Sequence, residues 1–338
     1  MIRYVDLFCG IGGFRIAANQ AFVRHIIPSK CVFSCDNDPF CQKSYSENFG
    51  EVPAGDITEI KAEDIPDHDL LFAGFPCQPF SIIGNGMGFE DTRGTLFFDV
   101  ARILEEKRPK SFILENVKRL VSHRNGHTFQ RILDTLKNLG YFTHTKILNA
   151  LDYGLPQKRE RIYIVGFDKM LSFQWPAKRN ERTPLSKILE KNVDIKYFAT
   201  DYIKKRRMSK HTPKEYPTIW HENKSGNISS YPYSCALRAN ASHNYLLVNG
   251  ERRLAPREML RLQGFPDWFK IVVPDSQIRK QAGNAVPVLV VHEILESMIP
   301  ILLNNYDIDI DKDKFIVKFI RESHARKKVT SIEDSAKD

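Results

Sequence analysis

The sequence lacks any long hydrophobic run. None of its apolar stretches approaches the roughly 20 residues that a membrane-spanning helix requires, so we expect no membrane span. The first six residues, Met-Ile-Arg-Tyr-Val-Asp, already read as a strand and lack the long apolar core of a signal peptide. The chain also shows no internal repeat. These absences favour a protein of the cytoplasm.

Cysteine is scarce and poorly spaced for metal binding. The six cysteines stand at positions 9, 31, 35, 41, 77 and 235, with no paired C-x-x-C spacing, and the nearest histidine to the first cluster, His25, is isolated. We therefore predict no metal site. Reduced thiols in a cytosolic protein fit this pattern better than disulfides do.

Charge is plentiful and mostly positive. The 338 residues are 42% hydrophobic and 27% charged, as in a globular protein, and the formal net charge is +9. Between Lys178 and Lys224 there are thirteen Lys or Arg against six Asp or Glu, and the run Lys204-Lys-Arg-Arg207 is the densest point. This balance favours a polyanionic partner.

Hydrophobic patterning predicts an α/β fold. Short apolar runs alternate with helical stretches through the first half, which is typical of a mostly parallel sheet with helices on both faces. From Trp175 prolines recur, basic residues dominate and periodicity fades, which indicates a smaller irregular domain. The strands are expected at 3–8, 31–35, 70–73, 111–114, 142–149 and 161–167, and the main helices at 14–22, 39–48, 95–107, 126–139 and 288–303.

One loop is chemically distinctive. Residues 73–81, Ala-Gly-Phe-Pro-Cys-Gln-Pro-Phe-Ser, place Cys77 between two prolines directly after the apolar run 69–72. Pro76 and Pro79 fix φ on both sides of the sulfur. A strand that ends in such a loop lies where open α/β sheets bind their ligands. Most free cysteines are buried structural residues, but this context favours a nucleophile.

Further motifs follow in order along the chain. The turn in Asp6-Leu-Phe-Cys-Gly-Ile-Gly-Gly-Phe14 is G-x-G-G, so it does not fit the G-x-G-x-x-G of an NAD-dependent oxidoreductase. Glu115-Asn-Val follows a strand, Gln157-Lys-Arg-Glu-Arg161 precedes one, and Gln281-Ala-Gly-Asn-Ala-Val-Pro287 precedes the last long helix. Together with the Pro-Cys-Gln loop, these motifs resemble those of the DNA (cytosine-5)-methyltransferases, from Asp6 to about residue 303.

The resemblance implies both a fold and a reaction. The fold is the Rossmann-like sheet of the S-adenosylmethionine-dependent methyltransferases, joined to a smaller target-recognition domain. The reaction is methyl transfer from S-adenosylmethionine to carbon 5 of a flipped-out cytosine in a short DNA sequence, through a covalent Cys77 adduct at carbon 6. Glu115 matches the acid that binds ring nitrogen 3 and the amine. Of Arg159 and Arg161, one resembles the arginine at the cytosine carbonyl oxygen, and the other supports the site by pairing.

The resemblance also assigns binding residues. In the Pro256–Pro266 motif, it favours structural ion pairs for Arg257, Glu258 and Arg261. Two positions depart from the family pattern, Ala285 where Ser is usual and Ala236 where Thr is usual. The cofactor residues are expected to be Phe8, Gly10, Ile11, Gly13, Asp36, Asn37, Asp56, Ile57, Gly74, Leu96 and Asn284. The DNA contacts are expected to be Ser81, Lys204, Lys205, Arg206, Arg207, Leu237 and Arg238.

Domain limits and partners follow from the same resemblance. We expect a discontinuous catalytic domain over 1–174 and 277–304, a target-recognition domain over 175–276, and a charged tail over 305–338. The expected partner is double-stranded DNA, and the expected context is a bacterial restriction-modification system. The cognate restriction endonuclease shares the recognition site but need not bind, and the protein is expected to act as a cytoplasmic monomer.

Two alternatives stay open at this point. The first is the family's tRNA-methylating branch, against which the basic insert and the missing Cys-Phe-Thr signature count. The second is a catalytically inactive DNA-binding regulator on the same fold, against which the joint presence of Cys77, Glu115 and Arg161 counts.

Overall fold

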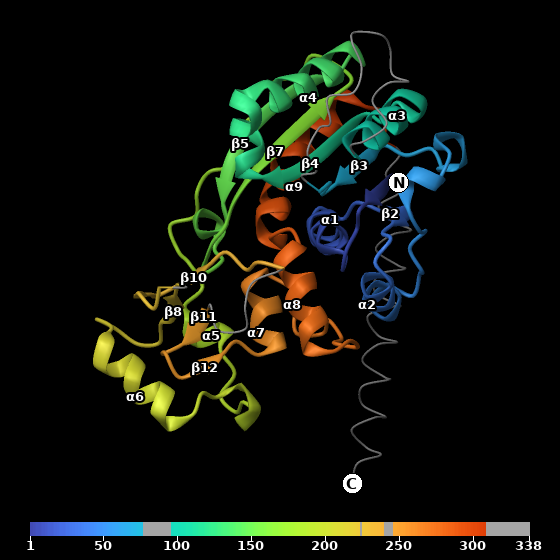
Figure 1. Ribbon diagram of the computed structural model, residues 1–338. Coiled ribbons are helices and arrows are strands. Elements are labelled where there is room, and N and C mark those ends of the chain that lie inside the picture. Colours follow the sequence, from blue (N-terminus) through green and yellow to red (C-terminus); the bar gives the residue numbers. More distant parts are fainter. Residues whose placement is uncertain (77–95, 224, 240–245, 309–338) are drawn as a thin grey trace.

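A six-stranded sheet forms the centre of the molecule (Figure 1). The computed structural model describes residues 1–76, 96–223, 225–239 and 246–308. The strand order is β2-β1-β3-β4-β7-β5. In that order the strands are Ser29–Cys35, Ile2–Leu7, Leu70–Ala73, Ser111–Val117, Glu160–Phe167 and Phe142–Asn149.

The sheet is mostly parallel, as predicted. β2, β1, β3 and β4 pair in parallel, whereas β7 pairs antiparallel with both β4 and β5. Only ten residues, 150–159, connect β5 to β7. This link is too short for the helical crossover that a parallel pair normally needs, so the chain returns as an antiparallel neighbour.

Helices cover both faces of the sheet, because successive side chains of each strand point to opposite faces and both faces are apolar. In β3, Leu70 and Phe72 face one hydrophobic cluster, and Leu71 and Ala73 face the other. The first cluster includes α1 and α9 and the second includes α3 and α4. The helices flanking the sheet are α1 (Gly13–Arg24), α2 (Pro39–Phe49), α3 (Leu96–Lys107), α4 (His127–Asn138) and α9 (Val288–Asn305).

The final helix is a core helix. Among the described residues, the stretch 275–305 is the one long and apolar enough to cross a membrane, but 61% of its most apolar window is buried inside the protein. Within α9, Val291, Ile294 and Leu295 are fully buried in the cluster that includes α1. Burial against the sheet therefore accounts for its hydrophobicity.

Residues after Trp175 are more regular than their composition suggests. They contain a four-stranded sheet in the order β12-β11-β8-β9, all antiparallel. Trp220 on β8 is fully buried, and Gly250, with φ of 74°, lies so close that a Cβ there would be 2.6 Å from the indole. The elements are α5 (Leu185–Ile188), α6 (Asp201–Lys210), β8 (Ile219–Glu222), β9 (Ile228–Tyr231), β11 (Leu246–Val248), β12 (Arg252–Arg253), α7 (Pro256–Leu262) and α8 (Asp275–Asn284).

A short parallel pair joins the two regions. β6 (Gln157–Lys158), just before β7, pairs with β10 (Ser234–Cys235). The Gln157 side chain extends this link, because its amide oxygen accepts from the backbone N–H of Leu237 at 2.9 Å and its amide nitrogen donates to the carbonyl of Leu262 at 2.9 Å. The loop that precedes β7 is therefore held against the second region.

A buried ion pair anchors α7. Arg252 donates two hydrogen bonds to Glu258, at 2.7 and 2.8 Å, and the Glu258 side chain is fully buried. The same carboxylate also accepts from the backbone N–H groups of Glu190 and Ala255. Glu258 is thus a structural residue, as the sequence predicted, and Arg261 pairs with Asp267 at 2.7 Å near the surface.

Replacing Glu258 with Ala should destabilise the protein by about 3–5 kcal/mol, because the buried Arg252 guanidinium would lose its counter-ion. Urea unfolding would measure the loss. The control is Asp267→Ala, which breaks the exposed pair with Arg261 and should cost at most about 1 kcal/mol. Equal losses in the two variants would contradict this account.

Candidate active site

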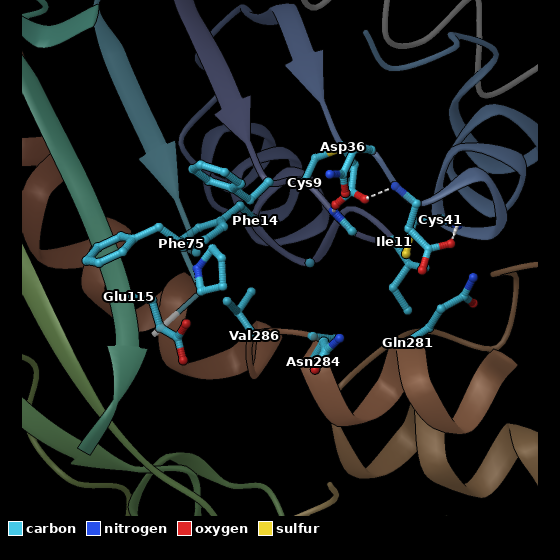
Figure 2. Close-up of a pocket in the computed structure, with 18 of the residues that line it drawn as sticks. Cys9, Ile11, Phe14, Asp36, Cys41, Phe75, Glu115, Gln281, Asn284 and Val286 are labelled. Atoms are coloured by element: carbon cyan, nitrogen blue, oxygen red, sulfur yellow. Dashed lines mark hydrogen bonds between the residues drawn. The ribbon is translucent and has the colours of Figure 1, made fainter. Parts of the chain in front are cut away.

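A cavity of about 470 Å³ lies at the carboxyl ends of β1, β2, β3 and β4 (Figure 2). Residues that directly follow or end these strands line it, as the edge of an open α/β sheet predicts. In Figure 2, Glu115 lies at the left of the view and Asp36 to its upper right, with Val286 and Asn284 below Asp36 and toward Glu115. The cavity therefore presents two separate acids, one from the end of β2 and one from β4.

A tight turn after β1 forms one wall. Phe8 and Gly10 have φ values of 55° and 54°, and Gly12 has φ of 80° where it precedes α1. A positive φ is rare and strained for phenylalanine, and such strain concentrates at functional sites. A Cβ at Gly13 would lie 2.7 Å from the Val286 side chain, so the start of α1 packs directly on the 284–287 turn.

Asp36 is fixed at the end of β2. One carboxylate oxygen accepts from the backbone N–H of Gly10 at 2.8 Å, and the other accepts from that of Asp38 at 2.9 Å. Burial raises the pKa of this carboxyl, and the two backbone donors partly offset the effect. Because each oxygen keeps a free lone pair, the group suits recognition of a hydroxyl pair.

Asp56 and Asn37 form the adjacent rim. The Asn37 amide donates to one Asp56 oxygen at 3.0 Å, and Thr58 donates its backbone N–H to the other at 3.0 Å. The hydrogen bonds from Thr58 and Asn37 lower the pKa of Asp56. An ionised acceptor therefore stands beside the buried Ile57 side chain.

Glu115 and Arg161 form a buried pair at the other end of the cavity. The Arg161 Nε lies 3.0 Å from the Glu115 carboxylate, and the two side chains are 14% and 8% exposed. Burial raises the pKa of Glu115, while the positive charges of Arg161 and Arg159 act in the opposite direction. β4 and β7 are hydrogen-bonded neighbours, which brings the two residues together.

Arg159 has a different role from Arg161. Its guanidinium is 1% exposed, and it donates to the backbone carbonyls of Leu237, Gly283 and Ala285 at 2.9 to 3.1 Å. Both arginines line the cavity, as their alternation along the chain predicted. These contacts make Arg159 the residue that positions the cavity walls, and Arg161 the one paired with the acid.

Lys280 and Gln281, which the sequence motifs did not predict, complete the site. Lys280 on α8 lines the cavity and pairs with Asp38, the N-cap of α2, at 2.7 Å. Gln281 donates to the carbonyl of Phe40 at 2.9 Å and accepts from Ser44 at 3.2 Å. Gln281 is the first residue of the 281–287 motif. Its contacts with Phe40 and Ser44 show that α8 packs against α2 beside the cavity.

The Pro-Cys-Gln loop begins at the same edge. Gly74, Phe75 and Pro76 line the cavity, and the Asn116 amide donates to the Phe75 carbonyl at 2.8 Å. Asn116 thus couples the Glu-Asn-Val motif to the start of the loop. Cys77 and Ser81 lie outside the described residues.

Comparison with known proteins agrees with this site. The model of the family "C-5 cytosine-specific DNA methylase" matches residues 2–300. The chain is 55% identical to the type II methyltransferase M.NgoBI of Neisseria gonorrhoeae, over 86% of this chain and 91% of that protein. It is 56% identical to M.HaeII of Haemophilus aegyptius, over 88% and 92%.

The chain belongs to the C-5 cytosine-specific DNA methylase family. It is a DNA (cytosine-5)-methyltransferase of the type II restriction-modification class. Among solved structures, it resembles the S. pombe Dnmt2 methyltransferase with a TM-score of 0.67 and 22% identity, covering 90% of this chain and all of that one. That likeness shows the shared fold. The family and its type II relatives decide against the tRNA and inactive-regulator alternatives.

The methyltransferase cavity gathers most of the predicted residues. Glu115, Arg159 and Arg161 line it, as do all eleven residues expected to bind the cofactor. Ala285 keeps a backbone role despite lacking a hydroxyl, because its carbonyl accepts from Arg159. The sequence motifs therefore converge on one edge of one sheet.

The predicted DNA contacts do not gather in this way. Arg207 is 4% exposed and donates to Glu222 at 3.0 Å and to the Gly250 carbonyl at 3.2 Å, so it is a structural residue. The Leu237 side chain is also buried. Lys204 lies 3.3 Å from Asp201, and α6 lies at the far end of the molecule from β3 and β4 (Figure 1). Arg238 is exposed.

A buried acid beneath the glycine turn gives a pH prediction. Asp6 on β1 is fully buried, which raises its pKa to about 8 although the Arg15 charge acts in the opposite direction. The folded protein therefore keeps a proton that the unfolded chain releases near pH 4. Its stability should fall as pH rises between those values, by up to about 1.4 kcal/mol per pH unit.

Asp6→Asn removes this titration, so relative to wild type the variant should gain about 2–3 kcal/mol between pH 5.5 and pH 7.5. Urea unfolding at the two pH values measures the difference. Asp67→Asn, at an exposed position, is the control and should follow wild type. If Asp6→Asn loses stability with pH as steeply as wild type, Asp6 is already ionised in the folded state.

Proposed function

We propose that the cavity binds S-adenosylmethionine at its Asp36 end and the flipped target cytosine at its Glu115 end. The observation that carries this proposal is the separation of two acids along one cavity, one held by backbone N–H groups and the other paired with Arg161. The family membership supports both ligands.

The described residues fit the cofactor. The Asp36 carboxylate suits the ribose hydroxyls, and Phe8 and Ile57 offer apolar surface to the adenine. Gly10 has open space where a side chain would stand, which lets a ligand approach the backbone closely. Asp56 is an acceptor for the adenine amino group. Gly13, Ile11 and Asn284 line the portion between the two acids, where the methionine part would lie.

S-adenosylmethionine, when bound, supplies an electrophilic methyl group. Cytosine carbon 5 is a poor nucleophile, so the protein must first make the ring electron-rich. The Cys77 thiolate does this by adding to carbon 6, and loss of the carbon 5 proton with elimination of the sulfur later restores the ring. Pro76, the preceding residue in the chain, lines the cavity.

The other thiols at the cavity are poor nucleophiles. Cys9, Cys35 and Cys41 also line it. Burial raises the pKa of Cys35 to about 12 and that of Cys9 and Cys41 well above the usual thiol range. Since the thiolate is the reactive form, these residues contribute little of it near neutral pH. This contrast favours Cys77.

Glu115 acts on the opposite edge of the ring. Burial favours its protonated form, so the carboxyl suits proton donation to ring nitrogen 3 as charge develops there. The Arg161 guanidinium holds the carboxyl in place at 3.0 Å and compensates the charge that remains after proton transfer. Arg159 supports the site from behind through the three carbonyls that it binds.

We further propose that residues 175–274 form the target-recognition domain and that 1–174 with 275–304 form the catalytic domain. α8 is continuous over Asp275–Asn284, so the boundary expected after residue 276 is better placed before this helix. The target base must leave the duplex to reach the cavity. The tail, 305–338, carries no assigned role.

The biological setting follows the relatives. We propose that the protein acts as a monomer in the bacterial cytoplasm on double-stranded DNA. It would protect host DNA from a cognate restriction endonuclease that shares the recognition sequence without binding the methyltransferase. The bacterial type II relatives support this setting.

Cys77→Ser should abolish methyl transfer and leave cofactor binding intact, because a hydroxyl is far less acidic than a thiol. Duplex DNA that contains 5-fluorocytosine should trap wild type covalently, since fluorine cannot leave as a proton. Denaturing gels and peptide mapping measure the adduct. The control, Cys235→Ser, should trap like wild type. An adduct mapped to any other cysteine would refute this assignment.

Glu115→Gln should slow the chemical step by about 10²–10⁴-fold, because an amide cannot transfer a proton to nitrogen 3. Single-turnover transfer of a tritiated methyl group to DNA measures the rate, and calorimetry measures cofactor affinity. Glu160→Gln, a neighbouring exposed acid paired with Lys118, is the control and should keep its rate. A change confined to cofactor affinity would remove Glu115 from the catalytic set.

A further inference from the structure

A second cavity, of about 400 Å³, lies between α8 and the small antiparallel sheet. Leu237, Leu246, Leu254 and Met259 give it an apolar floor, and all four are buried. Its remaining wall is strongly basic. Four cations line it, Lys196, Arg238, Arg253 and Arg279.

The four cations come from four separate segments of the chain. Asp275 is the one acid among the described lining residues, and it lies 3.6 Å from Lys196 and accepts from the Tyr197 hydroxyl. Arg253 donates to the Lys196 carbonyl at 2.7 Å, which holds its guanidinium beside the backbone of Lys196. The cavity therefore concentrates a net positive charge over a surface of low polarity, where attraction to an anion is strengthened.

Like charges have been brought close together here. Partial burial and the neighbouring Arg253 charge lower the pKa of Arg279. The nearby Asp275 offsets part of this repulsion, and an anion in the cavity would offset more of it. A ligand that presents several negative charges along a line matches cations supplied by different segments.

The second cavity adjoins the active site through α8. Gln281 and Gly283 line the catalytic cavity, whereas Ser276 and Arg279 on the same helix line the second one. A Cβ at Gly283 would lie 2.6 Å from the carbonyl carbon of Arg238, so the backbone of that residue packs directly on the helix. Residues of α8 therefore line both cavities.

We propose that the second cavity binds phosphate groups of the DNA backbone that flank the target cytosine, through Lys196, Arg238, Arg253 and Arg279. This inference rests on the proposed function, in which the flipped base occupies the catalytic cavity. The basic run on α6 is less suited to that task, because Arg207 is buried and α6 lies at the far end of the molecule from β3 and β4 (Figure 1).

The test compares two pairs of charge-neutralising substitutions. Arg253→Gln/Arg279→Gln removes two cations from the cavity, and the control pair Lys210→Gln/Lys214→Gln removes two exposed cations at and just after the end of α6. Fluorescence anisotropy would measure the affinity for a duplex of bacterial DNA sequence over a series of salt concentrations. Calorimetry with S-adenosylmethionine would report cofactor binding, and circular dichroism would report folding.

The cavity pair should bind DNA more weakly and lower the slope of log affinity against log salt by about 1 for each arginine removed. Cofactor affinity should not change, and the control pair should keep the wild-type slope. An unchanged slope in the cavity pair, or an equal loss in both pairs, would overturn the proposal. Should the cavity pair misfold, Arg253→Lys/Arg279→Lys keeps both charges and must restore the slope.

If the proposed function is wrong, the result differs from the one that contradicts only the second cavity. Wild type would then form no covalent adduct with 5-fluorocytosine DNA, whatever the salt dependence of the variants. If wild type forms the adduct and the cavity pair binds DNA with an unaltered salt slope, only the second cavity has been misassigned.

Discussion

A single buried guanidinium, that of Arg159, holds the catalytic edge of this molecule together. It precedes β7 in the sequence, and it bonds to carbonyls of the insert at Leu237 and of the final motif at Gly283 and Ala285. These segments are 78 to 126 residues away along the chain. Carbonyl groups at chain turns need donors, and one planar guanidinium serves three of them. The cavity has its shape because these walls share one donor.

Local patterns in the sequence were sufficient for most of the fold. Apolar runs ending in polar residues predicted the strands, and Phe142–Asn149 matches β5 without any shift. The reversal of β7 was not predicted, because strand direction depends on the length of the connection and not on the strand's own residues. The small antiparallel sheet was also missed. Its strands are two to four residues long, and such short runs carry almost no periodicity.

The candidate site was also predicted only in part: residues in local motifs were found, and residues brought in by tertiary packing were not. Glu115, Asp36 and the glycine turn were assigned through their resemblance to family motifs, and the structure brings them together because each follows or ends a strand and strand ends meet at one edge of a parallel sheet. Lys280 could not be found in this way, since only the packing of α8 against α2 brings it to Asp38. The basic run at 204–207 was wrongly expected to face outward throughout. The number of basic residues in a short segment does not show which of them face the solvent. Arg207 points inward and pairs with Glu222. The cations that do converge are dispersed between positions 196 and 279.

The contact between Gly283 and Arg238 also bears on how such enzymes diversify. No side chain fits between α8 and the insert at this point, so the two backbones must meet directly. An insert of new sequence, length or specificity can be accepted by the same catalytic sheet only if it returns its chain to this one junction. The junction depends on a glycine and on backbone atoms rather than on the insert's own side chains. Under the proposed assignment of target recognition to residues 175–274, whole segments can be exchanged while the site of chemistry stays intact.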